Sequence, residues 1–164
     1  KKNTAGLASR RGDLKIHKNL RSIPRKGVIL EPLCGKIFGP EDHELLTVKH
    51  GSLVGLDCSW AQIESSVETV MKRTRLVPRM LPLLLAANPV NWGKPSKLTT
   101  AEALAAALYL TGRIEQAKNV LGAFRWGNRF FELNKEPLDA YRMAKSSSEL
   151  VDLQFEFFDI EHLR

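Results

Sequence analysis

The sequence Asp-Cys-Ser-Trp at residues 57–60 carries side chains whose types could do chemistry. It follows the apolar run 53–56, which is typical of a strand buried on both faces. Ligands of open α/β sheets bind beyond the carboxyl ends of the strands, where a carboxylate, a hydroxyl and an indole could bind a ribose, a charged amino acid or a base. In the alternative interpretation, Asp57 or Ser59 only caps the next helix and Trp60 packs in the core.

A second polar and aromatic stretch, Ala-Ala-Asn-Pro-Val-Asn-Trp-Gly at residues 86–93, also follows an apolar run. The pair Asn88-Pro89 favours a turn, and Trp92 supplies a flat ring. Two such loops at one edge of a sheet predict a pocket. The sequence has no Gly-x-Gly-x-x-Gly, Walker, His-Glu-x-x-His or Gly-x-Ser-x-Gly motif, so P-loop hydrolysis and serine hydrolase chemistry have no support.

The elements that must position these loops alternate in the first half of the chain. Strand-like runs lie at 26–32, 52–60 and 79–87, with helical patterns at 39–51 and 61–74 between them. This alternation predicts a parallel α/β sheet.

The second half of the chain is predicted to be helical. Thr99 and Glu102 have the spacing of a capping box at the start of a helix over 101–110, which Gly112 ends. Further helical patterns follow at 113–124, 127–134, 137–145 and 147–158.

The charge distribution indicates a nucleic-acid partner. The net charge is +7, and residues 1–26 contain nine basic residues against one acid. A basic surface of this kind is expected to contact a phosphate backbone, although a solvated, solubilising face is the alternative. The predicted RNA contacts are Arg10, Arg11, Lys15, Lys72, Arg73 and Arg75.

Metal and membrane partners are not expected. The two cysteines and four scattered histidines have no metal-ligand spacing. No apolar run approaches the roughly 20 residues of a membrane helix. We expect a cytoplasmic monomer.

The combination of motifs resembles one family. Leu-Asp-Cys-Ser-Trp at 56–60, the whole stretch 81–112, and Phe-Arg-Trp-Gly-Asn-Arg-Phe-Phe-Glu-Leu-Asn at 124–134 with Leu-Asp-Ala-Tyr at 138–141 are similar to ribosome-biogenesis enzymes that modify small-subunit ribosomal RNA by aminocarboxypropyl transfer. The opening segment 1–12 is also similar to theirs, and the short chain resembles the archaeal members.

The resemblance implies a SPOUT-like fold with a deep trefoil knot. Residues 1–80 would form a basic, parallel-sheet α/β domain, and residues 81–164 an all-α domain that completes the knot and the cofactor pocket. It also implies S-adenosylmethionine as the donor of a 3-amino-3-carboxypropyl (acp) group. The acceptor would be N3 of a uridine or pseudouridine in small-subunit ribosomal RNA or a pre-ribosomal particle. The alternatives are a knotted RNA methyltransferase that uses the same cofactor and a non-catalytic ribosome-assembly factor that binds RNA.

The resemblance also implies where the cofactor binds. The adenine would lie against the backbone around 77–81 and Trp92, the ribose by Leu56 and Asp57, and the amino-acid end by Thr4. The predicted cofactor-binding residues are Thr4, Leu56, Asp57, Ser59, Trp60, Val77, Leu81, Trp92 and Ser96.

The choice of transferred group depends on alignment. A sulfonium makes three carbons electrophilic, and the carbon aligned with the nucleophile at about 3 Å is attacked. If Trp60 covers the methyl group, with a cation–π contact to the sulfonium, the propyl chain faces the RNA. The uracil N3 proton must leave, and Asp57 is the first candidate base and Glu102 the second. Glu102 is otherwise explained as a helix cap alone.

Overall fold

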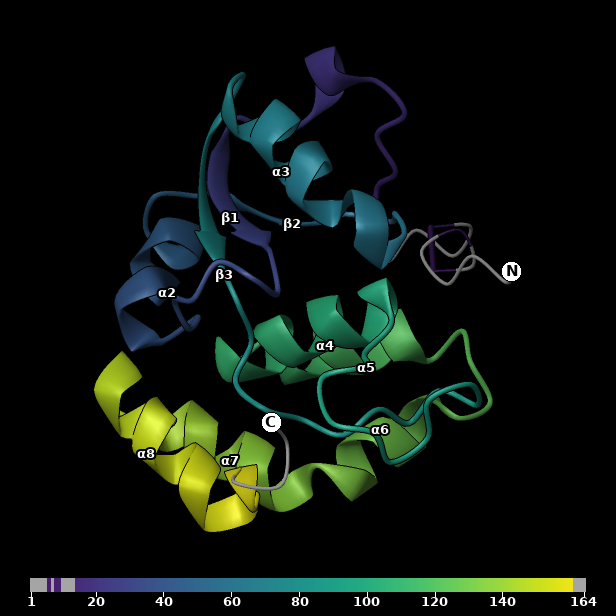
Figure 1. Cartoon of the computed structure of the whole chain (residues 1–164), viewed down its shortest axis with the longest axis vertical. Helices are drawn as coiled ribbons and strands as arrows, with labels where there is room; N and C mark the ends of the chain where they lie inside the picture. Colours follow the sequence, from purple (N-terminus) through teal and green to yellow (C-terminus); the bar gives the residue numbers. More distant parts are fainter. Residues whose placement is uncertain (1–5, 7, 10–13, 161–164) are drawn as a thin grey trace.

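The computed structural model describes residues 6, 8, 9 and 14–160. Within them lies a three-stranded parallel sheet with the strand order β2-β1-β3. The strands are β1 (Lys26–Leu30), β2 (Ser52–Gly55) and β3 (Arg75–Arg79). In the register, Val28 of the central strand lies opposite Leu53 on one side and Val77 on the other. All three strands therefore end at the same edge of the sheet (Figure 1).

Helices and short 3-10 helices make up most of the remaining structure, with α4 to α8 gathered below the sheet in Figure 1. In chain order these elements are η1 (Leu20–Ser22), α2 (Pro40–Thr47), η2 (Trp60–Gln62), α3 (Ile63–Met71), α4 (Thr100–Leu110), α5 (Ile114–Leu121), α6 (Gly127–Leu133), α7 (Lys135–Met143) and α8 (Ser147–Phe157).

Side chains on the two faces of β1 enter different parts of the core, as the two-residue period of a strand requires. Ile29 packs with Val67 of α3 and Leu76 of β3. Val28 and Leu30 belong instead to the larger cluster that contains the apolar sides of the helices from α4 to α8. The sheet is thus covered on both faces, which explains the uninterrupted apolar sequence of β1.

The predicted strands and helices before residue 75, and the helices after residue 99, are confirmed in type. The third predicted strand, 79–87, is wrong in position because β3 covers Arg75–Arg79. Beyond β3, up to residue 160, the chain makes only isolated bridges, Ile37 with Met80 and Leu85 with Pro95.

Within the segment after β3, the backbone groups of Leu83 and Leu85 bond side chains of the helical part of the chain rather than a neighbouring strand. The Leu83 N–H donates to Gln154 Oε1 at 2.8 Å, and Tyr141 Oη donates to the Leu83 carbonyl at 3.1 Å. The Leu85 N–H donates to Asn134 Oδ1 at 2.7 Å, and Asn134 Nδ2 donates to the Leu85 carbonyl at 2.9 Å. These bonds satisfy buried backbone groups that a sheet would otherwise pair.

The predicted fold class needs correction. Over the described ranges the structure is a small α/β fold with a three-stranded parallel sheet. A SPOUT-like deep trefoil knot with a separate parallel-sheet domain is not what it shows. The physical reason for the small sheet is that the apolar run 79–87 does not extend it, because Leu83 and Leu85 donate their N–H groups to side chains of the helical part of the chain.

In the part of the chain that the structure describes, no helix combines the length and the apolar content that a membrane crossing requires.

Candidate active site

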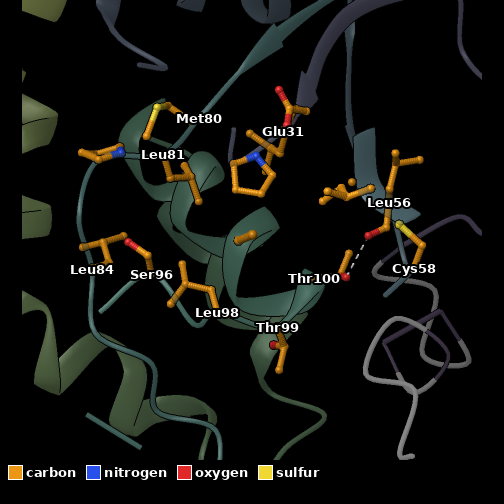
Figure 2. Close-up of a pocket in the computed structure, with 16 residues that line it drawn as sticks. Glu31, Leu56, Cys58, Met80, Leu81, Leu84, Ser96, Leu98, Thr99 and Thr100 are labelled. Carbon is orange, nitrogen blue, oxygen red and sulfur yellow. Dashed lines mark hydrogen bonds between the residues drawn. The ribbon is translucent and has the colours of Figure 1, made fainter. Parts of the chain in front are cut away.

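A cleft opens beyond the carboxyl ends of the three strands (Figure 2). Its lining comes from the end of β1 and the residues after it (30–32), from the last residue of β2 and the residues after it (Gly55, Leu56 and Cys58), and from the segment after β3 (80–82 and Leu84). The start of α4 and the preceding loop close it from below. This is the edge at which parallel α/β sheets bind ligands.

The start of α4 is fixed against the end of β2. Thr100 Oγ1 donates a hydrogen bond to the Leu56 carbonyl at 3.3 Å (Figure 2). The capping box predicted from the sequence is confirmed, because the Glu102 N–H donates to Thr99 Oγ1 at 3.2 Å and the Thr99 N–H donates to Glu102 Oε2 at 2.7 Å. Thr99 and Thr100 both line the cleft, so the cap also sets the position of its lower wall.

Glu102 also holds the Asn-Pro turn of the 86–93 loop. Its Oε1 accepts the backbone N–H groups of Ala87 at 2.7 Å and Asn88 at 3.0 Å. Its Oε2 accepts the Asn88 side-chain amide at 2.9 Å, besides the Thr99 N–H. The carboxylate is fully buried and uses its usual four acceptor sites. Its predicted role as a catalytic base receives no support from this geometry.

The loop itself folds back on the segment after β3. The Gly93 N–H donates to the Ala86 carbonyl at 2.7 Å, and the Ser96 N–H donates to the Leu84 carbonyl at 3.0 Å. Ser96 has a φ of 57°, a left-handed conformation that serine seldom adopts. Backbone strain of this kind costs about 1–3 kcal/mol and often occurs beside ligands. Ser96 lines the cleft.

The structure brings some of the predicted cofactor-binding residues together and leaves others outside. Leu56, Leu81 and Ser96 all line the cleft (Figure 2). Asp57 and Ser59 do not line it, but they flank the lining residue Cys58, and Asp57 is exposed.

Two further predicted residues, Val77 and Trp92, do not line the cleft. Val77 lies inside β3, paired with Val28. The Trp92 side chain is 54% exposed on the loop. Trp60 begins η2, but its side chain lies outside what the structure describes, as do Thr4, Arg10 and Arg11 as whole residues.

Sequence reasoning missed Glu31. This glutamate directly follows β1, lines the cleft and is only 7% exposed. The signal that selected Asp57, an acid directly after a buried apolar strand, was also present at this position.

Four of the predicted RNA contacts, Lys15, Lys72, Arg73 and Arg75, are exposed. Lys72 and Arg73 follow α3, and Arg75 begins β3. A shallow hollow is lined by Arg21, Arg25 and Arg73.

Lys72 of this surface and the nearby Arg79 are each paired with a carboxylate. Lys72 pairs with Glu68 at 2.8 Å on the surface, and this hydrogen bond lowers the pKa of the Glu68 carboxyl. Arg79, which lies four residues after Arg75, forms a largely buried ion pair with Asp42 at 2.8 Å, so it stabilises the fold.

Candidate metal ligands do not gather: among the described residues no three His, Cys, Asp or Glu side chains could hold a metal ion together.

Comparison with known proteins identifies the family. The model of the family described as "Ribosome biogenesis protein, C-terminal" matches residues 28–158, which include every residue that lines the cleft. The chain belongs to this family. The resemblance inferred from the sequence motifs is thereby confirmed.

Two relatives of this chain carry the same name. The 16S rRNA aminocarboxypropyltransferase of Methanosarcina acetivorans is 45% identical over 140 residues, which cover 85% of this chain and 77% of that protein. The 16S rRNA aminocarboxypropyltransferase of Methanothermobacter thermautotrophicus is 41% identical over 157 residues, covering 96% and 90%.

A solved structure is similar over almost the whole chain. The SAM-dependent rRNA:acp-transferase Tsr3 from Vulcanisaeta distributa superposes with a TM-score of 0.75 at 32% identity, covering 93% of this chain and 88% of that one. This likeness supports the corrected α/β fold.

Proposed function

We propose that this protein transfers the acp group of S-adenosylmethionine to N3 of a uridine or pseudouridine in small-subunit ribosomal RNA. The observation that carries the proposal is the cleft at the strand ends, which lies wholly inside residues 28–158, the region that the ribosome-biogenesis family model matches. Relatives over most of the chain are named 16S rRNA aminocarboxypropyltransferase. The chain is an enzyme of this class, a transferase with ribosomal RNA as its substrate.

The residues present fit S-adenosylmethionine. Leu56, Leu81 and Leu98 give the cleft apolar walls that suit a purine and the carbons around a sulfonium. The strained backbone at Ser96 and the turn held by Glu102 give the loop one fixed shape. We place the adenine between Leu81 and Ser96 and the ribose near Leu56.

The reaction forms one bond and breaks one bond. The N3 atom of the base attacks the terminal carbon of the propyl arm, and the bond between that carbon and sulfur breaks. The bonding electrons stay on sulfur, which leaves as uncharged 5′-methylthioadenosine. The N3 proton goes to a base, and we assign this role to Asp57, which is exposed beside the cleft where RNA can reach it.

Two further features decide which group moves and where the RNA lies. We propose that Trp60, at the start of η2, covers the methyl group and leaves the propyl arm facing the RNA. The exposed cations Lys15, Lys72, Arg73 and Arg75 would hold the phosphate backbone of the RNA or of a pre-ribosomal particle. In this arrangement residues 1–80 supply most of the basic surface and residues 81–164 complete the pocket.

A double-label transfer assay tests the proposal. Small-subunit RNA is incubated with the protein and with S-adenosylmethionine labelled either in its carboxyl carbon or in its methyl group. We expect only the carboxyl label to enter the RNA. Entry of the methyl label would show a methyltransferase instead, and entry of neither label, with no binding of the cofactor, would show an RNA-binding assembly factor.

A further inference from the structure

Glu31 is the one charged side chain among the described residues that line the cleft. Its position is fixed by the sheet, because it directly follows the central strand and its backbone N–H donates to the Arg79 carbonyl at 2.8 Å. The side chain lies on the side of the cleft opposite Leu98 and Thr99 (Figure 2). Its neighbours in the lining, Leu30 and Pro32, are apolar.

The carboxylate of Glu31 is buried but only partly used. Oε1 accepts the Leu33 N–H at 2.9 Å, while Oε2 has no partner within the described ranges of the chain. Glu102, the other buried glutamate beside the cleft, accepts four hydrogen bonds. A buried charge with an unused oxygen is unfavourable unless a partner arrives. The contrast between the two glutamates indicates that the partner of Glu31 is a ligand.

We propose that Glu31 is a specificity-determining residue that binds a cationic group of S-adenosylmethionine, either its sulfonium or its α-ammonium. The inference rests on the proposed function. The donor carries two positive charges against one carboxylate, so its net charge is +1. Because the lining around Glu31 is apolar, an opposite charge interacts there more strongly than it would in water.

Such a contact lets the enzyme distinguish its donor from its product. Transfer of the acp group removes the α-ammonium together with the propyl arm and converts the sulfonium to a thioether. The product 5′-methylthioadenosine therefore offers Glu31 no cation. The donor makes a contact with Glu31 that the product cannot make, so Glu31 makes the donor bind more tightly than the product and adds nothing to the binding of the product.

Two other roles for Glu31 make different predictions. If the carboxylate only holds the turn at Leu33, its loss should weaken every ligand of the cleft equally. If it is the base for the N3 proton, its loss should lower kcat and change the pH profile without changing the affinity for S-adenosylmethionine. Only if Glu31 recognises a cation should its loss weaken the binding of the charged ligands and leave the binding of the uncharged ligand unchanged.

Calorimetry with three ligands tests the inference. We compare the wild-type protein with Glu31→Gln and with the control Glu115→Gln, whose carboxylate lies exposed on α5. The probes are S-adenosylmethionine, S-adenosylhomocysteine, which keeps the ammonium and lacks the sulfonium, and 5′-methylthioadenosine, which lacks both.

For Glu31→Gln we expect the affinity for S-adenosylmethionine to fall about 10-fold or more, with the affinity for 5′-methylthioadenosine unchanged. A parallel loss for S-adenosylhomocysteine would assign the contact to the ammonium, and a loss confined to S-adenosylmethionine would assign it to the sulfonium. The Glu115→Gln protein should bind all three ligands like the wild type.

Equal losses for all three ligands, or an unchanged preference for S-adenosylmethionine over 5′-methylthioadenosine, would overturn the inference. If Glu31→Gln does not fold, Glu31→Asp keeps the charge but withdraws it by one methylene. A reduced preference for the donor in that variant supports the inference, and an unchanged preference contradicts it. A wild-type protein that fails to bind S-adenosylmethionine would reject the proposed function itself.

Discussion

Glu102 and Asn88 are joined through both the backbone and the side chain of the asparagine. The Asn88 N–H donates to Glu102 Oε1 at 3.0 Å, and Asn88 Nδ2 donates to Oε2 at 2.9 Å. Asn88 Oδ1 in turn accepts the Asn91 N–H at 3.0 Å, which forms the turn of the loop. One carboxylate thus caps α4 and fixes the loop beside the cleft, so the two cannot move independently.

Glu102→Gln should destabilise the protein and weaken cofactor binding together. The amide has one acceptor oxygen and would turn its NH₂ group toward buried donors. We expect a loss of about 2–3 kcal/mol in the free energy of unfolding, measured by urea denaturation. The control Glu115→Gln, on an exposed helix face, should stay within about 0.5 kcal/mol of the wild type. A Glu102→Gln protein as stable as the wild type would contradict the role of Glu102 in joining the start of α4 to the 86–93 loop.

Asp57→Asn should lower the rate of transfer and leave the fold intact. Asp57 is exposed, so the free energy of unfolding should change by no more than about 0.5 kcal/mol. If its carboxylate takes the N3 proton, kcat under saturating RNA and cofactor should fall about 10²–10⁴-fold. Single-turnover kinetics measure this directly. A change in KM for the cofactor at constant kcat would assign Asp57 to the ribose instead.

Trp60→Ala should weaken the binding of S-adenosylmethionine while RNA binding stays nearly the same. The indole is expected to cover the methyl group, and its removal exposes the sulfonium to water and takes away a cation–π contact worth about 0.5–2 kcal/mol. Calorimetry for the cofactor and filter binding for the RNA give the two affinities. Equal losses in both would argue against this position for Trp60.

Charge reversal of Arg73 and Arg75 should weaken RNA binding and flatten its dependence on salt. Each phosphate contact that is lost should reduce the slope of log K against log salt by about one. Binding of the variant to small-subunit RNA is measured across a salt series, with Lys118→Glu on α5 as the control. An unchanged slope would show that the RNA lies on another surface.

Local signals in the sequence predicted the elements around the cleft well. The Thr99–Glu102 capping box and the Asn88-Pro89 turn depend on residues a few positions apart, and both take the expected form. The acid after a buried strand is also a local signal, but it was applied to β2 and not to β1, so Glu31 was missed.

Long-range pairing explains the main error. The run 79–87 has the composition of a buried strand, yet Leu83 and Leu85 within it bond side chains far along the chain. Asn134 lies 49 residues from Leu85, and Gln154 lies 71 residues from Leu83. Apolar periodicity does not reveal such partners, so it predicted a sheet strand where the structure has an extended segment held by helices. The SPOUT-like fold class was implied by the family resemblance and not by this periodicity.

A crystal structure of the protein with S-adenosylmethionine tests the central claim most directly. The account predicts that the adenosine lies in the cleft against Leu56, Leu81 and Ser96, with the methyl group enclosed and the propyl arm open toward the basic surface. A ligand bound elsewhere, or one whose methyl group faces solvent while the propyl arm is enclosed, would contradict it.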